Sequence, residues 1–234
     1  MNTNLKEFQK IIGYEFRDES LLKQALTHSS YANEHHMKKL SDNEKLEFLG
    51  DAVLEIVSSE FLYLNYPDLN EGKLSRLRAS IVCEPTLAYC CKEINLGDFV
   101  LLSKGEDMTG GRNRKSILSD AFEATIGAIY LDGGMEPASK YIHRFVLNDI
   151  EHKQLFHDSK TRLQEVVQAN FSEPLHYELI SETGPDHAKE FKVEALVGDK
   201  VLGYGIGRTK KAAEQEAAYE GLMMLHKEES IKII

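Results

Sequence analysis

Residues 43–54 read Asn-Glu-Lys-Leu-Glu-Phe-Leu-Gly-Asp-Ala-Val-Leu, and their apolar residues recur at the spacing of an amphipathic helix. Ser41 or Asp42 is suited to cap this helix, and Pro67 limits its end because the residue before a proline avoids helical geometry. The helix carries carboxylates at steps of three, four and four, which places them on one face: Glu44, Glu47, Asp51 and Glu55. Like charges at this spacing destabilise a helix, so the row needs a compensating partner or full solvation.

A second pair of carboxylates, Asp120 and Glu123, stands within an apolar run over residues 116–131 that predicts a helix. Carboxylates buried in such a run need a cation or dense hydrogen bonding. Magnesium prefers oxygen ligands and is usually held by a few carboxylates together with water and phosphate oxygens. Carboxylates from two facing helices fit that need and would support attack of an activated water on phosphorus. A solvated acidic stripe is the alternative interpretation, because charge runs are usually exposed faces.

The sequence pattern changes near residue 150, which predicts two domains, residues 1–151 and residues 158–227. The first pattern is helical almost throughout and predicts an all-α domain. One helix is expected over 71–82 and another from Glu84-Pro85 to Gly97. A loop is expected over 105–114, and a last helix of this domain ends at about Glu151. A polar bridge over 152–157 leads into the second pattern: a helix over 158–170, strands that include 191–197, a two-residue turn at Gly198-Asp199 and a helix from Thr209 to about His226. The order helix, three strands, helix predicts a small α+β domain.

The composition is that of an ordinary globular protein, with 42% apolar and 28% charged residues. No apolar stretch is long enough for a membrane span and the first residues contain no apolar signal core, so we expect a cytoplasmic protein without membrane contact. Cys83, Cys90 and Cys91 lack the spacing of a disulfide framework or a zinc site and are expected in the core.

Several ordered segments together carry a family resemblance. They are residues 43–54, Gly13-Tyr-Glu-Phe16, Ala25-Leu-Thr-His-Ser-Ser-Tyr31, Gly72-Lys-Leu-Ser-Arg-Leu-Arg78 and Ser119-Asp-Ala-Phe-Glu-Ala-Thr-Ile-Gly127. In this order they resemble the ribonuclease III family. Three more segments resemble the motifs of a double-stranded-RNA-binding domain: Asp158-Ser-Lys-Thr-Arg-Leu-Gln-Glu165, Gly184-Pro-Asp-His187 and Lys211-Ala-Ala-Glu-Gln-Glu-Ala-Ala218. The chain is therefore similar to bacterial-type ribonuclease III, with one domain of each kind.

The resemblance implies an endoribonuclease that cleaves double-stranded RNA by metal-assisted phosphodiester hydrolysis. It implies Mg²⁺, with Mn²⁺ as a possible substitute, and a homodimer that makes staggered cuts with 5′-phosphate and 3′-hydroxyl ends. Ribosomal RNA precursors and other structured RNAs are the implied substrates. Carried over by position, the catalytic carboxylates that bind the metal are Glu47, Asp51, Asp120 and Glu123.

Four other residues of the first domain have more than one interpretation. Glu44 and Glu71 match acidic family positions at the edge of the site, and the resemblance implies a role in cleavage or in RNA contact. The alternative is that both are carboxylates at a helix start, where the helix dipole favours negative charge. Phe48 is a core residue or an aromatic at the dimer interface, and the resemblance favours the interface. Glu55 matches no catalytic position and is expected to be solvated or ion-paired.

The net charge of −10 is unusual for a protein that binds nucleic acid, and residues 158–227 carry only 9 Lys and Arg against 12 Asp and Glu. The positive charge must therefore be concentrated locally. Lys210 and Lys211 follow Thr209 at the start of a helix, where free backbone N–H groups also attract phosphate. We interpret them as a phosphate clamp, with solvated lysines as the alternative.

Other RNA contacts are expected from neutral and cationic side chains in both domains. In the second domain they are Thr161, Gln164 and Glu165 on one helix face, together with Gln168, and His187 on a tight turn. In the first domain Lys73, Arg76 and Ser80 share a helix face, and Arg112, Arg114 and Lys115 lie in the expected loop. The alternative for each group is a solvated surface.

Two other functions remain as alternatives. A double-stranded-RNA-binding scaffold without cleavage could lack any of the four metal carboxylates, all of which this chain retains. A metal phosphohydrolase acting on small nucleotides would not need a duplex-binding domain.

Overall fold

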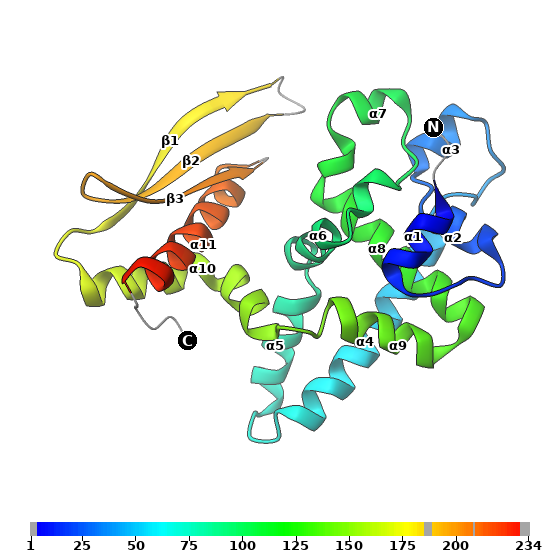
Figure 1. Cartoon of the computed structure of the whole chain (residues 1–234), viewed down its shortest axis with the longest axis horizontal. Helices are drawn as coiled ribbons and strands as arrows, with labels where there is room; N and C mark the ends of the chain where they lie inside the picture. The colour runs from blue at the N-terminus through cyan, green and yellow to red at the C-terminus, as the bar shows by residue number, and fades with distance from the viewer. Residues whose placement is uncertain (1–3, 185–188, 208, 230–234) are drawn as a thin grey trace. The chain divides into compact units, whose positions relative to one another are not determined.

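The computed structural model describes residues 4–184, 189–207 and 209–229. Contacts between Cα atoms divide the chain into two units, Met1–Ile150 (unit 1) and Glu151–Ile234 (unit 2). Each unit has its own hydrophobic core. Figure 1 shows the helices of unit 1 and the three-stranded sheet of unit 2. No helix within the described residues combines the length and the apolar character needed to cross a membrane.

Unit 1 is helical, as the sequence predicts. Its helices are α1 (Leu5–Ile12), α2 (Glu19–Ala25), α3 (Ser29–Glu34), α4 (Glu44–Asn65), α5 (Glu71–Val82), α6 (Glu84–Glu93), α7 (Lys104–Met108), α8 (Lys115–Gly133) and α9 (Met135–Phe145), with 3-10 turns η1 (Leu96–Asp98) and η2 (Gly111–Asn113). The predicted helix over 71–82 is confirmed, and α8 contains the whole of the predicted helix over 116–131. Helix α6 ends at Glu93 and not at Gly97, because Asn95 has a positive φ of 50° that interrupts it.

Helix α4 is the acidic helix of the sequence, and it packs against α8 in the centre of unit 1. It ends at Asn65, before Pro67, as predicted. It begins at Glu44, so the residue at the cap position is Asn43 and not Ser41 or Asp42. The reason lies in the backbone, because the Asn43 N–H donates to the Thr27 carbonyl at 2.9 Å and fixes where the helix starts.

The prediction of a loop over residues 105–114 is wrong, because α7 and η2 occupy most of it. The Ser103 hydroxyl accepts a hydrogen bond from the Glu106 N–H at 3.2 Å and caps α7. Ser103 and Glu106 stand at the spacing of a capping box, which is a sequence signal for a helix start. The glycines of this segment obscured that signal.

The predicted polar bridge over 152–157 is also wrong, because α10 runs without interruption over Ile150–Asn170. The bridge contains no proline or glycine, so nothing in it stops a helix. The break comes earlier, between α9 and α10, where Asp149 has a positive φ of 54°.

Unit 2 has the predicted order of helix, three strands and helix. Its elements are α10 (Ile150–Asn170), β1 (Leu175–Thr183), β2 (Glu190–Val197), β3 (Lys200–Gly207) and α11 (Lys210–Glu229). The strands form an antiparallel sheet in the order β1-β2-β3, and Val197 pairs with Lys200 across the predicted turn at Gly198-Asp199. Val193 and Ala195 of β2 are buried in one core with Leu163 of α10 and Leu222 of α11.

Candidate metal centre

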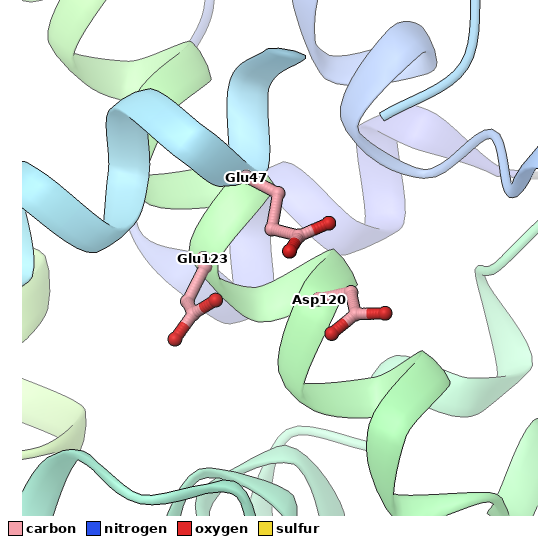
Figure 2. Close-up of side chains that lie close together, drawn as sticks. All are labelled: Glu47, Asp120 and Glu123. Carbon is pink, nitrogen blue, oxygen red and sulfur yellow. The ribbon is translucent and has the colours of Figure 1, made fainter. Parts of the chain in front are cut away.

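Three carboxylates meet where α4 and α8 pack against each other. Glu47 comes from α4, and Asp120 and Glu123 come from successive turns of α8. One carboxylate oxygen of each lies within 4.8 Å of those of the other two. Figure 2 shows Glu47 reaching from α4 toward the two α8 side chains. Residues distant in sequence therefore form one acidic cluster, which we call the carboxylate cluster.

The charges of the carboxylate cluster are poorly compensated by the protein. Burial, followed by the charges of Asp51, Glu47 and Asp120, raises the pKa of Glu123 to about 8. Burial and the neighbouring carboxylates also raise the pKa of Glu47, and burial with the charge of Glu84 raises the pKa of Asp120. Within the described residues no lysine, arginine or histidine pairs with the three side chains.

This donor set fits a hard divalent cation. Carboxylate oxygens are the ligands that Mg²⁺ and Mn²⁺ prefer in proteins. Partly buried carboxylates at such short separations need a positive charge to remain ionised together. A divalent cation among the three oxygens would supply that charge.

The other acidic residues of α4 lie outside the carboxylate cluster. Asp51 and Glu44 are exposed, although the charge of Asp51 acts on Glu123 and that of Glu44 acts on Glu47. Glu55 forms an ion pair with Arg78 at 2.9 Å, which confirms the ion-paired interpretation. At the start of α5, Glu71 accepts a hydrogen bond from the Ser75 hydroxyl at 2.8 Å.

Sequence reasoning gave no role to Glu84, whose charge has the largest electrostatic effect on Asp120. Glu84 is the first residue of α6, and it reaches the neighbourhood of Asp120 only because α6 packs on α8. No spacing rule links the two residues in the sequence. The pattern at Glu84-Pro85 indicated only a helix start.

Phe48 projects from α4 away from the core. Its side chain is 81% exposed in the single chain, so the core interpretation is wrong. Ile56 and Tyr63 on the same helix are also exposed, at 59% and 75%. A surface hollow of about 670 Å³ lies beside them between α4 and α5, lined in part by Ile56, Tyr63, Leu69 and Leu74.

Several cationic or polar candidates of unit 1 have internal partners. The Arg112 guanidinium donates to the carbonyls of Gly97 and Val100 and pairs with Asp107, so it holds the segment around α7 together. Arg114 pairs with Glu106. Ser80 is buried and donates to the Leu77 carbonyl at 2.7 Å, so its expected contact with phosphate is wrong. Lys73 and Arg76 remain exposed on α5.

The RNA-contact candidates of unit 2 that the structure describes are at its surface. Thr161 and Glu165 are exposed on α10 and Gln164 is half-buried beside them, while Glu165 pairs with Arg162 at 3.2 Å. His187 lies outside the described residues.

Lys210 and Lys211 are exposed in the first turn of α11. The Thr209 hydroxyl caps this helix by accepting from the Ala212 N–H at 3.1 Å, as predicted. Both ammonium groups therefore stand at the positive end of a helix, the end that attracts anions.

Comparison with known proteins identifies the two units. Residues 18–150 match the family model described as ribonuclease-III-like, and residues 159–225 match the double-stranded RNA binding motif. The chain belongs to the ribonuclease III family.

Two curated relatives named Ribonuclease 3 resemble nearly the whole chain. The protein from Bacillus velezensis is 50% identical over 224 residues, which cover 95% of this chain and 90% of the relative. The protein from Caldanaerobacter subterraneus is 50% identical over 224 residues, covering 94% of this chain and 98% of the relative. A protein of this family with both domains is an endoribonuclease, so the non-cleaving scaffold and the nucleotide phosphohydrolase are set aside.

Unit 1 also resembles a solved structure, the nuclease domain of ribonuclease III from Campylobacter jejuni. The identity is 45% and the TM-score 0.57, over 61% of this chain and 96% of that one. The Campylobacter domain has a region described as involved in dimer formation.

Proposed function

We propose that this ribonuclease III cleaves double-stranded RNA by hydrolysis at the carboxylate cluster, with Glu47, Asp120 and Glu123 holding Mg²⁺ and Mn²⁺ able to replace it. The observation that carries the proposal is the convergence of these three poorly compensated carboxylates in a nuclease of this family. Asp51, exposed at the edge of the cluster, is proposed as a fourth metal ligand, and Glu44 is proposed as a further catalytic residue. The nuclease domain is proposed to span residues 1–151 and the RNA-binding domain residues 158–227.

The carboxylates are proposed to act in this reaction by binding the cation. A bound divalent cation supplies an activated water and offsets negative charge on the scissile phosphate. Glu47, Asp120 and Glu123 would hold the cation at a fixed place, and Asp51 and Glu44 are exposed at the edge of the cluster. In the hydrolysis the water oxygen forms a bond to phosphorus and the bond from phosphorus to the 3′ oxygen breaks. The products are a 3′-hydroxyl and a 5′-phosphate.

Protonation of Glu123 in the metal-free protein gives a measurable prediction. With a pKa of about 8 against an ordinary value of 4.5, Glu123 is mostly protonated at pH 7. Because the pKa of Glu123 is higher in the folded than in the unfolded protein, the folded state binds this proton more tightly. The resulting contribution to the free energy of unfolding is present at low pH and is lost as the pH rises toward 8. We therefore expect the thermal midpoint of the metal-free protein to fall from pH 5 to pH 8. Calorimetry in buffers of different ionisation enthalpy should show that Mg²⁺ binding at pH 7 releases about one proton.

A matched control is Glu55→Gln, which removes a carboxylate of α4 that pairs with Arg78 and lies outside the carboxylate cluster, and which should leave the proton release unchanged. At pH 9 the release should disappear, since Glu123 is then already ionised. A binding heat at pH 7 that is the same in every buffer would show that Glu123 does not give up a proton to the metal.

The RNA-binding domain is proposed to hold the duplex through three groups of residues. Thr161, Gln164 and Glu165 on α10 suit the 2′-hydroxyls of the minor groove, and His187 is proposed to enter an adjacent groove. Lys210 and Lys211 are proposed to bind phosphate together with the first N–H groups of α11. This concentrated charge would let an acidic chain bind an acidic polymer.

The lysine proposal separates affinity from stability. Each ammonium opposes the helix dipole at a cost of about 0.3–1 kcal/mol at low salt, so replacing both with Ala should leave unit 2 at least as stable. The slope of log K against log salt should flatten by roughly 0.9 per lost phosphate contact, with B-DNA standing in for duplex RNA. Binding titrations at several salt concentrations and the thermal midpoint measure the two effects. A less stable domain with an unchanged slope would assign these lysines a structural role.

We further propose a homodimer through α4, in which two cleavage sites cut the two strands at a stagger. The apolar side chains of Phe48, Ile56 and Tyr63 are exposed on α4, and Ile56 and Tyr63 line the surface hollow. Such exposed apolar side chains are expected of a surface that another chain covers. The dimer region of the similar Campylobacter domain supports this proposal.

Ribosomal RNA precursors and other structured RNAs in the cytoplasm are the proposed substrates.

The test of the function is cleavage of a long RNA duplex by the pure protein, with Mg²⁺ or with a chelator. Short fragments with 5′-phosphate ends should form only with the metal. Cleavage of single-stranded RNA of the same sequence at an equal rate, or cleavage in chelator, would contradict the proposal.

A further inference from the structure

The helices that carry the carboxylate cluster approach each other at two glycines. A Cβ atom added to Gly50 of α4 would lie 1.8 Å from the Glu123 carbonyl oxygen of α8. A Cβ added to Gly127 of α8 would lie 2.2 Å from the Leu46 carbonyl oxygen of α4. Since real Cβ atoms essentially never come within 3.0 Å of another heavy atom, no residue except glycine fits either position without movement of a backbone.

The atoms at this contact belong to the residues that form the cluster. The carbonyl under Gly50 is that of Glu123 itself, and the carbonyl under Gly127 belongs to Leu46, the neighbour of Glu47. The contact is reciprocal, with each helix offering a glycine to a carbonyl of the other. The distance between the two backbones at the carboxylates is therefore set by the absence of two side chains.

We propose that Gly50 and Gly127 are positioning residues of the metal centre, which fix the separation between Glu47 on α4 and Glu123 on α8. The inference rests on the proposed function of the carboxylate cluster. An alanine at either glycine would require about 1 Å of movement to reach even the 3.0 Å limit. Binding sites tolerate errors of only about 0.5 Å in the placement of their groups, so this movement should weaken the metal site.

Close packing alone is the competing explanation, and Gly97 offers a matched control for it. Gly97 lies in η1 of the same unit, and a Cβ there would lie 2.3 Å from the Arg112 carbonyl oxygen, almost the same obstruction as at Gly127. Gly97 adjoins no carboxylate of the cluster. If the glycines matter only for packing, Gly127→Ala and Gly97→Ala should behave alike.

The experiment compares wild type, Gly127→Ala and Gly97→Ala as full-length chains. Mn²⁺ affinity is measured by electron paramagnetic resonance without RNA, and the thermal midpoint is measured without metal. We expect both variants to lose stability, but only Gly127→Ala to weaken Mn²⁺ binding, by tenfold or more. An equal change in Mn²⁺ affinity in the two variants, or none in Gly127→Ala, would overturn the inference. Failure of the wild type to bind Mn²⁺ would instead contradict the proposed metal centre.

If Gly127→Ala does not fold, hydrogen exchange in the wild-type protein addresses the same coupling. Mn²⁺ should slow exchange of the Gly50 and Gly127 amides at least tenfold, because the cation would hold the two helices together at these residues. The Gly97 amide should be unaffected. Exchange at Gly50 and Gly127 that does not respond to Mn²⁺ would show that the helix contact and the metal site are independent.

Discussion

Replacing Glu123 with Gln is expected to lower the rate of duplex cleavage by about a thousandfold or more, since a catalytic metal contributes several kcal/mol and each 1.36 kcal/mol is a factor of ten. Burial, followed by the charges of Asp51, Glu47 and Asp120, raises the pKa of Glu123 to about 8, so its ionised form depends on a bound cation. The amide keeps the shape of the side chain but removes the charge that a cation requires.

Duplex affinity should stay within about threefold in Glu123→Gln, because Glu123 is proposed to contact the metal and not the RNA, and duplex affinity depends mainly on contacts with phosphate. Single-turnover cleavage and a binding titration measure the two quantities. The matched control is again Glu55→Gln, whose carboxylate pairs with Arg78. A Glu123→Gln protein that cleaves at the wild-type rate with saturating Mg²⁺ would remove Glu123 from the site.

Phe48→Ala is expected to break the dimer and lower cleavage together. Truncating an aromatic side chain that is buried at an interface typically costs about 2 kcal/mol or more of the free energy of association. Phe48→Ala should therefore weaken association roughly thirtyfold. Sedimentation at micromolar concentration and cleavage by the same samples measure the effect. Met108→Ala is the control, because Met108 is 88% exposed and lies on α7. A monomeric wild-type protein that still makes staggered double cuts would contradict the dimer.

The helices that the sequence predicted well are those in which periodicity and end signals agree. Helix α5 begins and ends as expected, and α4 ends before Pro67. The errors came from segments where composition masked a local signal. The glycines near α7 suggested a loop, although Ser103 and Glu106 have the spacing of a helix cap. The polar residues over 152–157 suggested a break in α10, although this segment contains no proline or glycine that would end a helix.

The pairing of carboxylates across α4 and α8 depends on information that the spacing within one helix does not contain. The pattern placed Asp51 and Glu47 on one face, but only Glu47 joins Asp120 and Glu123 within 4.8 Å. What brings these three together is the contact at Gly50 and Gly127, which is a property of the packed helices. Glu84 escaped prediction for the same reason.

Anomalous scattering from Mn²⁺ in crystals of the wild-type protein is the most direct test of the metal centre. A peak should lie among the oxygens of Glu47, Asp120 and Glu123, about 2.1 Å from its ligands, as expected for octahedral divalent cations. The peak should be absent in crystals of Glu123→Gln grown in the same way. Manganese bound only at other sites in the wild-type crystals would contradict the assignment of the carboxylate cluster as the metal centre.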